Sequence, residues 1–218
     1  MSEMLNVVKL GDLKAFLPMD RNDFYENEIK LFKSGQKSDL VVSVINVLLF
    51  NTKGEVLIQK RSYTKKHNPG LLDKSIGGHI DWDNQSDYTA MVETIQELQI
   101  PSVVLKDEAD FKKTLNILKD YLGTVCLVRF IDKHLYKLPK LINGDWIEIN
   151  NLVSFYLGVY DGRIRPIDGE VKGVLWYSLE DLRREMTQTP EVFTPDLRHY
   201  LEIYEEEIAK FILATKKD

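Results

Sequence analysis

Cysteine is almost absent from this sequence, and glycine and proline are scarce. Among 218 residues there is one cysteine, Cys126, which excludes an internal disulfide and a zinc site built from several cysteines. Cys126 lies in the apolar run 124–128, so we expect it to be buried. The 12 glycines and 7 prolines are too few for a disordered or fibrous chain.

Long apolar runs are also missing. No stretch of about 18 apolar residues occurs, so no membrane-spanning helix is expected. The first residues lack a basic start followed by a continuous apolar segment, which argues against a signal peptide and favours a cytoplasmic protein. The net charge of −5 argues against a general binder of nucleic acids or anionic membranes. It leaves room for a local basic pocket that holds a phosphorylated small molecule.

The residues that are present fit one mixed α/β domain. Helical and strand periodicities interleave along a chain that is 44% hydrophobic and 29% charged. We expect helices at 20–33, 85–98, 107–122, from 178 and from 195, and strands at 40–50, 55–62, 124–131, 152–160 and 173–177. A long connection is expected at 132–149, and a hairpin turn at Asp161-Gly162.

The segment 77–100 carries the most chemical information. At about 100° per residue, Glu93, Gln96 and Glu97 fall on one face of the expected helix. Two carboxylates one turn apart repel each other, and a divalent cation bound between them would remove that repulsion. An acidic helix face is equally compatible with simple exposure to water. The pair by itself leaves both interpretations open.

The residues ahead of this helix narrow the choice. Gly77-Gly78-His79 ends an expected strand and leads toward the helix, and here the sequence resembles the Nudix family. When the family's box is started at Gly78, it is also matched by Glu93, Glu97 and Ile100. The box positions that depart from the family pattern are Asn84, Val92, Thr94, Gln96 and Gln99.

The flanking segments extend the resemblance. Residues 56–79, with Arg61, Asp73 and a Ser-x-Gly-Gly-His motif, look like the Nudix branch that includes isopentenyl diphosphate isomerase. Residues 169–182 resemble the family's later Glu-Val strand and the helix after it. The resemblance covers about 39–215 and is interrupted by an unusual insertion at about 101–150. Residues 1–38 remain as an N-terminal extension whose helix packs on the domain.

The resemblance implies a fold and an activity. The fold would be an α/β/α sandwich around a mixed sheet, with the box at 78–100, an inserted helix-loop segment and a C-terminal helix. The activity would be cleavage of a diphosphate bond in a nucleoside diphosphate derivative or related organic diphosphate by metal-activated water, with Mg²⁺ or Mn²⁺. The expected partner is this small molecule, with neither nucleic acid nor membrane, and residues 132–149 are a candidate homodimer interface.

The resemblance also assigns roles to residues. Glu93 and Glu97 would be metal ligands or the catalytic base, and Gln96 stands at the third acidic position of the helix. Gly77 would contribute its carbonyl and Glu170 a further carboxylate to the metal. The substrate would be contacted by Lys60, Arg61, Gly78 and His79.

Several of these assignments have alternatives. The basic residues of 60–66 would otherwise form an exposed turn, and His79 would otherwise hydrogen-bond within its own loop. The other histidines lack ligand-like spacing and are assigned no role: His67, His134 and His199.

The departures from the box motivate two further hypotheses. Because Gln96 carries no charge, the chain could be a Nudix fold that binds a nucleotide or regulates without catalysis. Isomerisation is disfavoured, since the isomerases of the resembling branch use a cysteine where this chain has Gly77. Gln99 replaces a glycine and would cost about 1 kcal/mol if the helix ends in the left-handed conformation.

Overall fold

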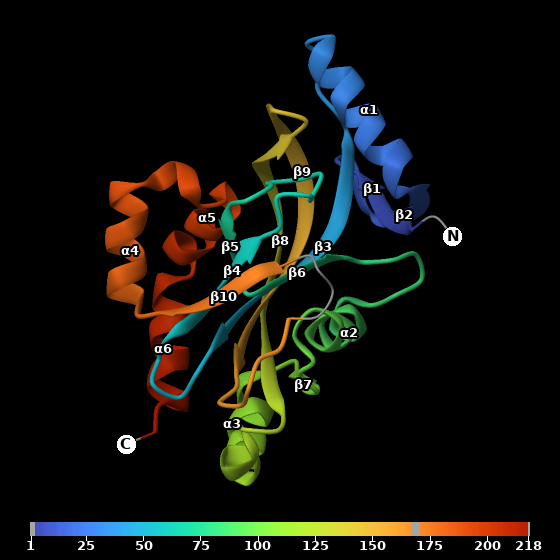
Figure 1. Ribbon diagram of the computed structural model, residues 1–218. Helices are drawn as coiled ribbons and strands as arrows, with labels where there is room; N and C mark the ends of the chain where they lie inside the picture. Colours follow the sequence, from blue (N-terminus) through green and yellow to red (C-terminus); the bar gives the residue numbers. More distant parts are fainter. Residues whose placement is uncertain (1–2, 167–170, 218) are drawn as a thin grey trace.

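The computed structural model describes residues 3–166 and 171–217 (Figure 1). The strands are β1 (Met4–Lys9), β2 (Asp12–Asp20), β3 (Leu40–Phe50), β4 (Val56–Arg61), β5 (Leu72–Asp73), β6 (Ile76–His79), β7 (Ser102–Leu105), β8 (Cys126–Ile142), β9 (Asp145–Val159) and β10 (Val171–Tyr177). The helices are α1 (Arg21–Lys33), α2 (Ser86–Leu98), α3 (Glu108–Leu118), α4 (Leu179–Gln188), α5 (Pro195–Ile203) and α6 (Glu205–Thr215), with short 3₁₀ turns at Lys119–Tyr121 and Pro190–Val192.

The strands form one mixed sheet with helices on both faces (Figure 1). The order is β10-β4-β3-β9-β8-β7, and β1 and β6 also pair with β3. The β3–β9 and β7–β8 pairs are parallel. One apolar cluster joins the sheet to α5 and α6 through Tyr200, Ile208 and Phe211, and a second joins it to α2 through Ala90 and Leu98. This arrangement confirms the expected α/β/α sandwich.

Most of the expected elements are present. The helix at 20–33 is α1, whose first turn is capped by Asp20, since Asp20 Oδ1 accepts a hydrogen bond from the Asn22 amide at 2.8 Å. The expected helix at 85–98 is α2. The segment expected as one helix at 107–122 is α3 followed by a 3₁₀ turn. The last expected helix is divided at Tyr204 into α5 and α6.

Residues 132–149 are not a connection. They form most of a long antiparallel hairpin in which β8 pairs with β9, and Asn143 and Gly144 make the turn with φ of 52° and 92°. Such positive φ values are typical of two-residue hairpin turns. Ile147 and Ile149 are buried on either side of exposed Glu148, which is the alternation of a strand. The expectation was wrong because Pro139 and Asn-Gly are typical of loops.

The expected hairpin turn at Asp161-Gly162 is also wrong, because β10 pairs with β4 and not with β9. Asp161 instead holds the turn after β3: its Oδ1 accepts hydrogen bonds from the amide and the hydroxyl of Thr52 at 2.8 and 2.9 Å.

The N-terminal hairpin was not anticipated. β1 pairs with both β2 and β3, and Leu5 and Val7 are buried. The Trp82 amide donates to the Met4 carbonyl at 2.7 Å, and the Asn6 amide donates to the Ile80 carbonyl at 2.9 Å. β1 therefore fixes the segment that leads from β6 into α2.

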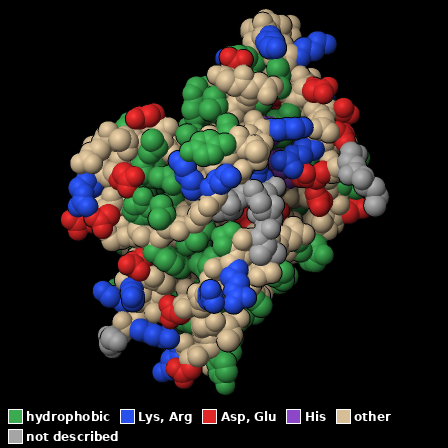
Figure 2. All heavy atoms as spheres, in the orientation of Figure 1, with side chains coloured by type: hydrophobic (Ala, Val, Ile, Leu, Met, Phe, Trp, Pro, Cys, Tyr) green, Lys and Arg blue, Asp and Glu red, His purple; other side chains and the backbone are tan. Residues whose placement is uncertain are grey.

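None of the helices formed by the described residues is both long and apolar enough to cross a membrane. On the face shown in Figure 2, basic and acidic side chains are interspersed, and no large area carries one sign alone.

Candidate functional site

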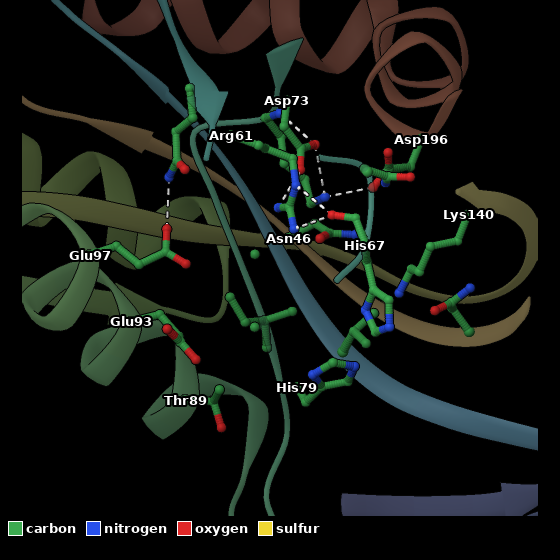
Figure 3. Close-up of a pocket in the computed structure, with 18 of the residues that line it drawn as sticks. Asn46, Arg61, His67, Asp73, His79, Thr89, Glu93, Glu97, Lys140 and Asp196 are labelled. Atoms are coloured by element: carbon green, nitrogen blue, oxygen red, sulfur yellow. Dashed lines mark hydrogen bonds and ion pairs between the residues drawn. The ribbon is translucent and has the colours of Figure 1, made fainter. Parts of the chain in front are cut away.

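A cavity of about 810 Å³ lies where α2, β6, the loop before β5, the β8 arm, α1 and the start of α5 meet (Figure 3). Its lining is mostly charged or polar. Acidic side chains from α2 line one side, and side chains from α1, β8 and α5 line the others. Elements from the whole length of the chain therefore contribute to one site.

The α2 side of the cavity carries Glu93 and Glu97 (Figure 3). Glu97 is only 7% exposed, and its Oε2 accepts a hydrogen bond from Gln59 Nε2 at 2.7 Å. Gln59 also donates to the Ser75 carbonyl, so the amide that orients Glu97 is itself fixed. Glu93 lies against Gly78, where a Cβ atom would stand 2.2 Å from Glu93 Oε1. This carboxylate can occupy its place only because residue 78 has no side chain.

The donors near α2 are compatible with a hard divalent cation. Glu93, Gln96, Glu97 and Gly77 all line the cavity, whereas Glu170 lies outside the described residues. Within 3–166 and 171–217, no three His, Cys, Asp or Glu side chains are grouped closely enough to hold a metal by themselves. Mg²⁺ is commonly held by one or two carboxylates, with water and substrate phosphates completing its shell. Two carboxylates and neighbouring amide oxygens fit that pattern.

A buried ionic network forms the side of the cavity next to α5. Asp73 accepts hydrogen bonds from Lys74 Nζ at 3.1 Å, from Arg61 at 3.0 Å and from the Thr194 hydroxyl at 2.8 Å. Lys74 Nζ also donates to Asp196 Oδ2 at 2.5 Å. Burial acts to raise the pKa of Asp73, but Lys74 and Arg61 outweigh it and lower that pKa. Burial acts to lower the pKa of Lys74, but Asp196 and Asp73 raise it. Both partners of the pair are therefore charged at neutral pH.

Two neutral histidines lie on a third side. The Tyr25 ring stands 4.0 Å from the ring of His67, and its hydroxyl hydrogen-bonds His79 Nε2 at 2.8 Å. Lys140 Nζ donates to the same hydroxyl at 3.0 Å. Burial, together with the Lys140 charge, lowers the pKa of His67 to about 2 and that of His79 well below its ordinary value. Both rings are uncharged acceptors or donors at neutral pH.

Of the four residues predicted to contact the substrate, three line the cavity and Lys60 is not among the described lining residues. Arg61, Gly78 and His79 line the cavity. Lys60 is adjacent to Arg61 in β4, and adjacent side chains of a strand point to opposite faces of the sheet. The Lys60 Nζ lies 6.0 Å from the centroid of the Tyr63 ring. Lys65 lines the cavity, whereas Lys66 contacts Asn22 at 3.4 Å.

Sequence reasoning missed several lining residues. His67 was assigned no role, yet it lines the cavity. The lining residues that sequence reasoning did not consider include Asn46, Lys74, Lys140, Asp196 and Tyr200. Lys74 directly precedes the Ser-x-Gly-Gly-His motif, within the segment 56–79 that carries the family resemblance, so its position was a usable signal. Nothing in the local sequence marks Lys140 or Asp196, because the folding of distant segments brings them here.

Comparison with known proteins places the chain in a family. Residues 40–197 match the model of the NUDIX domain. Because this match covers most of the chain, the protein belongs to the Nudix family.

Curated relatives and solved structures agree with this assignment. An isopentenyl-diphosphate Delta-isomerase of Serratia proteamaculans (strain 568) is 24% identical over 155 residues, which cover 71% of this chain and 72% of the relative. One of Cereibacter sphaeroides (strain ATCC 17029 / ATH 2.4.9) is 29% identical over 165 residues, covering 74% and 78%.

Among solved structures, DR0079 from Deinococcus radiodurans superposes with a TM-score of 0.62 at 17% identity, covering 92% of this chain and 98% of the other. The MutT protein from Methanosarcina mazei Go1 gives 0.53 at 18% identity, covering 76% and 93%. These likenesses show a shared fold.

Proposed function

We propose that the protein is a Nudix-type hydrolase that cleaves a diphosphate bond in a nucleoside diphosphate derivative or a related organic diphosphate. The observation that carries the proposal is the pair Glu93 and Glu97, which line one cavity from adjacent turns of α2. A buried carboxylate held by an amide, as Glu97 is by Gln59, is oriented before a ligand arrives.

The charges around the cavity support a phosphorylated ligand. Four basic side chains also line it: Arg21, Arg61, Lys65 and Lys140. Figure 3 shows Arg61 and Lys140 across the cavity from Glu93 and Glu97. Guanidinium and ammonium groups bind phosphate oxygens through charge-assisted hydrogen bonds. A diphosphate between the two sides would therefore meet cations from the chain on one side and the carboxylates on the other.

The proposed metal site uses the residues on the α2 side. Glu93 and Glu97 would hold Mg²⁺ or Mn²⁺ with the Gln96 amide and the Gly77 carbonyl, and one of the two glutamates would take the proton of the attacking water. When bound, the cation would neutralise phosphate oxygens and lower the pKa of a bound water. The contribution of Glu170 stays a prediction, because that residue lies outside the described part of the chain.

The test is release of phosphate or nucleoside monophosphate from a panel of organic diphosphates with Mg²⁺ or Mn²⁺. We expect Glu97→Gln to lower kcat by about 100-fold or more, because the amide is neither an anionic ligand nor a base. The matched control is Glu202→Gln on the exposed face of α5, which should leave kcat unchanged. Wild-type turnover that survives Glu97→Gln would contradict the site assignment.

A second candidate is a Nudix fold that binds a nucleotide without cleaving it. It is favoured by Gln96, which leaves two negative side chains at the helix site in place of three. Calorimetry distinguishes the two, since tight binding of a nucleoside diphosphate with no product after long incubation would support the binding module. Efficient turnover would exclude it.

Because the curated relatives are named isopentenyl-diphosphate Delta-isomerases, isomerisation of isopentenyl diphosphate is a further activity to test. Residue 77 is glycine, and any side chain there would have to displace Lys74, because a Cβ would stand 2.6 Å from Lys74 Cε. None of the described lining residues is a cysteine, and Cys126 is fully buried in the core beneath α2. We therefore expect no isomerisation of isopentenyl diphosphate, measured by following the position of its double bond.

A further inference from the structure

The outer part of the β8–β9 hairpin extends beyond the rest of the sheet. The pairing of β9 with β3 ends at Asn151 and Val42. The pairing of β9 with β8 continues past that point, to Asp145 and Ile142 at the turn. Residues 137–150 therefore form a two-stranded ribbon. Because such a ribbon is only marginally stable in water by itself, contacts with other segments have to fix its place beside the cavity.

Asn68 connects this ribbon with the loop before β5. Its backbone amide donates to the Leu141 carbonyl at 2.9 Å, and its Oδ1 accepts a hydrogen bond from the Leu141 amide at 2.8 Å. The preceding residue, His67, forms an isolated antiparallel bridge with Ile142. Asn68 is only 5% exposed, so water competes little for these hydrogen bonds. One asparagine thus gives Leu141 both the donor and the acceptor that a neighbouring strand would supply.

The loop that carries Asn68 is itself fixed to the wall of the cavity. Arg61 Nε and Nη2 donate to the His67 carbonyl at 3.2 and 3.0 Å, and Arg61 Nη1 donates to Asp73 at 3.0 Å. Asn68 has a φ of 49°, a left-handed conformation that asparagine and glycine adopt more readily than other residues. The ribbon is therefore attached to a segment that the buried ionic network already holds in place.

Lys140 directly precedes Leu141 and lines the cavity. Its Nζ donates to the Tyr25 hydroxyl at 3.0 Å and stands 5.3 Å from the centroid of the Tyr25 ring. None of the described carboxylates forms an ion pair with Lys140, so its charge is available to an anion in the cavity. Burial and the Lys140 charge lower the pKa of His67 to about 2, and Figure 3 shows the two side chains next to each other. The place of this ammonium group depends on where the ribbon lies.

We propose that Asn68 is a positioning residue that holds Lys140 where its ammonium group contacts the phosphate oxygens of a bound diphosphate. The two hydrogen bonds to Leu141 set the distance between the ribbon and the loop, and with it the reach of Lys140 into the cavity. A lysine side chain has many rotamers, so fixing its backbone reduces the entropy that is lost when the ammonium group binds an anion. The inference rests on the proposed function, because that function places a diphosphate in the cavity.

Calorimetry with methylenediphosphonate and Mg²⁺ tests this role. The carbon between the two phosphorus atoms of this probe prevents hydrolysis, so binding is measured separately from turnover. We expect Lys140→Met, which removes the ammonium group, to weaken binding by about tenfold to a hundredfold. We expect Asn68→Gly to weaken it by about threefold to tenfold, because glycine keeps the left-handed backbone and loses the acceptor for the Leu141 amide.

Combining the two substitutions separates a positioning role from a structural one. In the Lys140→Met background, Asn68→Gly should change the affinity by less than about twofold, because no ammonium group is left to position. The same pair of measurements with Asn68→Ala gives a second result that does not depend on the flexibility of glycine. The matched control is Asn143→Gly, the same substitution at an exposed asparagine of the hairpin turn with a φ of 52°, which should keep the wild-type affinity.

The outcomes distinguish this proposal from the proposed function. An equal loss of affinity from Asn68→Gly in both backgrounds would show a merely structural role and overturn the proposal. Wild-type affinity in Asn68→Gly or in Lys140→Met, or no binding of the probe to the wild type at millimolar concentration, would also overturn it. If the expected affinities are found and no organic diphosphate is cleaved, the role of Asn68 is supported and only the hydrolase proposal fails.

Discussion

Gly77 and Gly78 are two residues whose missing side chains shape the cavity. Neither has a positive φ among the backbone angles of the described chain, so their requirement is space and not backbone conformation. A Cβ at Gly77 would meet Lys74, and one at Gly78 would meet Glu93. Each glycine therefore lets a charged side chain approach the backbone of β6.

Gly78→Ala should disturb Glu93 while leaving the fold intact. The added Cβ would stand 2.2 Å from Glu93 Oε1, so the carboxylate has to move out of its place. We expect the affinity for Mn²⁺, measured by calorimetry with a nucleoside diphosphate present, to fall by about 10–100-fold. Gly173→Ala is the matched control, since that strand glycine has nothing within 4 Å of its Cβ position. Equal manganese affinity in the wild type and in Gly78→Ala would contradict this role.

The residues that line the cavity differ in how far the sequence reveals them. Glu93 and Glu97 are four positions apart on one helix, so their spacing alone predicts that they lie on one face. Lys74 and Asp196 are 122 positions apart and meet only through the packing of α5 against the sheet. Sequence patterns over a few residues predict neighbours on the same helix, such as Glu93 and Glu97. They carry no information about contacts between distant segments, such as Lys74 with Asp196.

At the scale of single elements, α2 ends in a conformation that its sequence does not favour. Gln99 caps the helix in the left-handed region, with φ 56° and ψ 37°. Its amide donates to the Ile95 carbonyl at 3.0 Å, which closes the last turn. The family resemblance predicted a glycine-like helix end at this position, and the geometry has been kept although the glycine has not.

Gln99→Gly should therefore stabilise the protein. Removing the Cβ relieves the left-handed strain, and we expect the free energy of unfolding in urea to rise by about 1 kcal/mol. Gln188→Gly provides the comparison, because Gln188 is the last residue of α4 and is not among the described residues with positive φ. That change should be neutral or destabilising. A loss of stability in Gln99→Gly would contradict the strain argument.

The β8–β9 hairpin shows how an element escapes sequence analysis. Its β8 arm has few fully buried residues beyond Phe130, and Pro139 interrupts the pattern of a strand. This arm is a strand because it pairs with β9, and the antiparallel pairing continues to Ile142 and Asp145 at the hairpin turn. Lys140 reaches the cavity on this arm. The candidate role of residues 132–149 in a homodimer stays a prediction.

At the scale of the whole molecule, distant segments meet around Tyr25. This α1 residue contacts His67 from the loop before β5, His79 from β6 and Lys140 from β8. Closing such long loops costs entropy that the packed junction has to offset. Folding therefore places two uncharged histidines where cations surround them.

The neutral state of His67 gives the stability of the whole protein a pH dependence. The folded-state pKa is about 2, below the ordinary value of 6.5. Between these values the unfolded chain binds a proton that the folded chain excludes, so this residue lowers stability as the pH falls below about 6.5. The slope is about 1.4 kcal/mol per pH unit.

His67→Gln should remove this contribution. We expect the free energy of unfolding in urea to fall less for the variant than for the wild type between about pH 7 and about pH 5, by about 2 kcal/mol. His134→Gln, at an exposed histidine, is the control for the substitution itself. Parallel pH profiles for the wild type and His67→Gln would show that His67 accepts a proton in the folded state.

The sequence by itself determined the mixed α/β class, most helices and strands, and the acidic face of α2. Periodicity and turn residues act over a few positions, and that is the range over which those features are set. The tertiary structure alone decided that Lys74, Asp196 and Lys140 share a cavity with Glu93 and Glu97. Their proximity comes from the order and curvature of the sheet, which depend on contacts between segments more than a hundred residues apart.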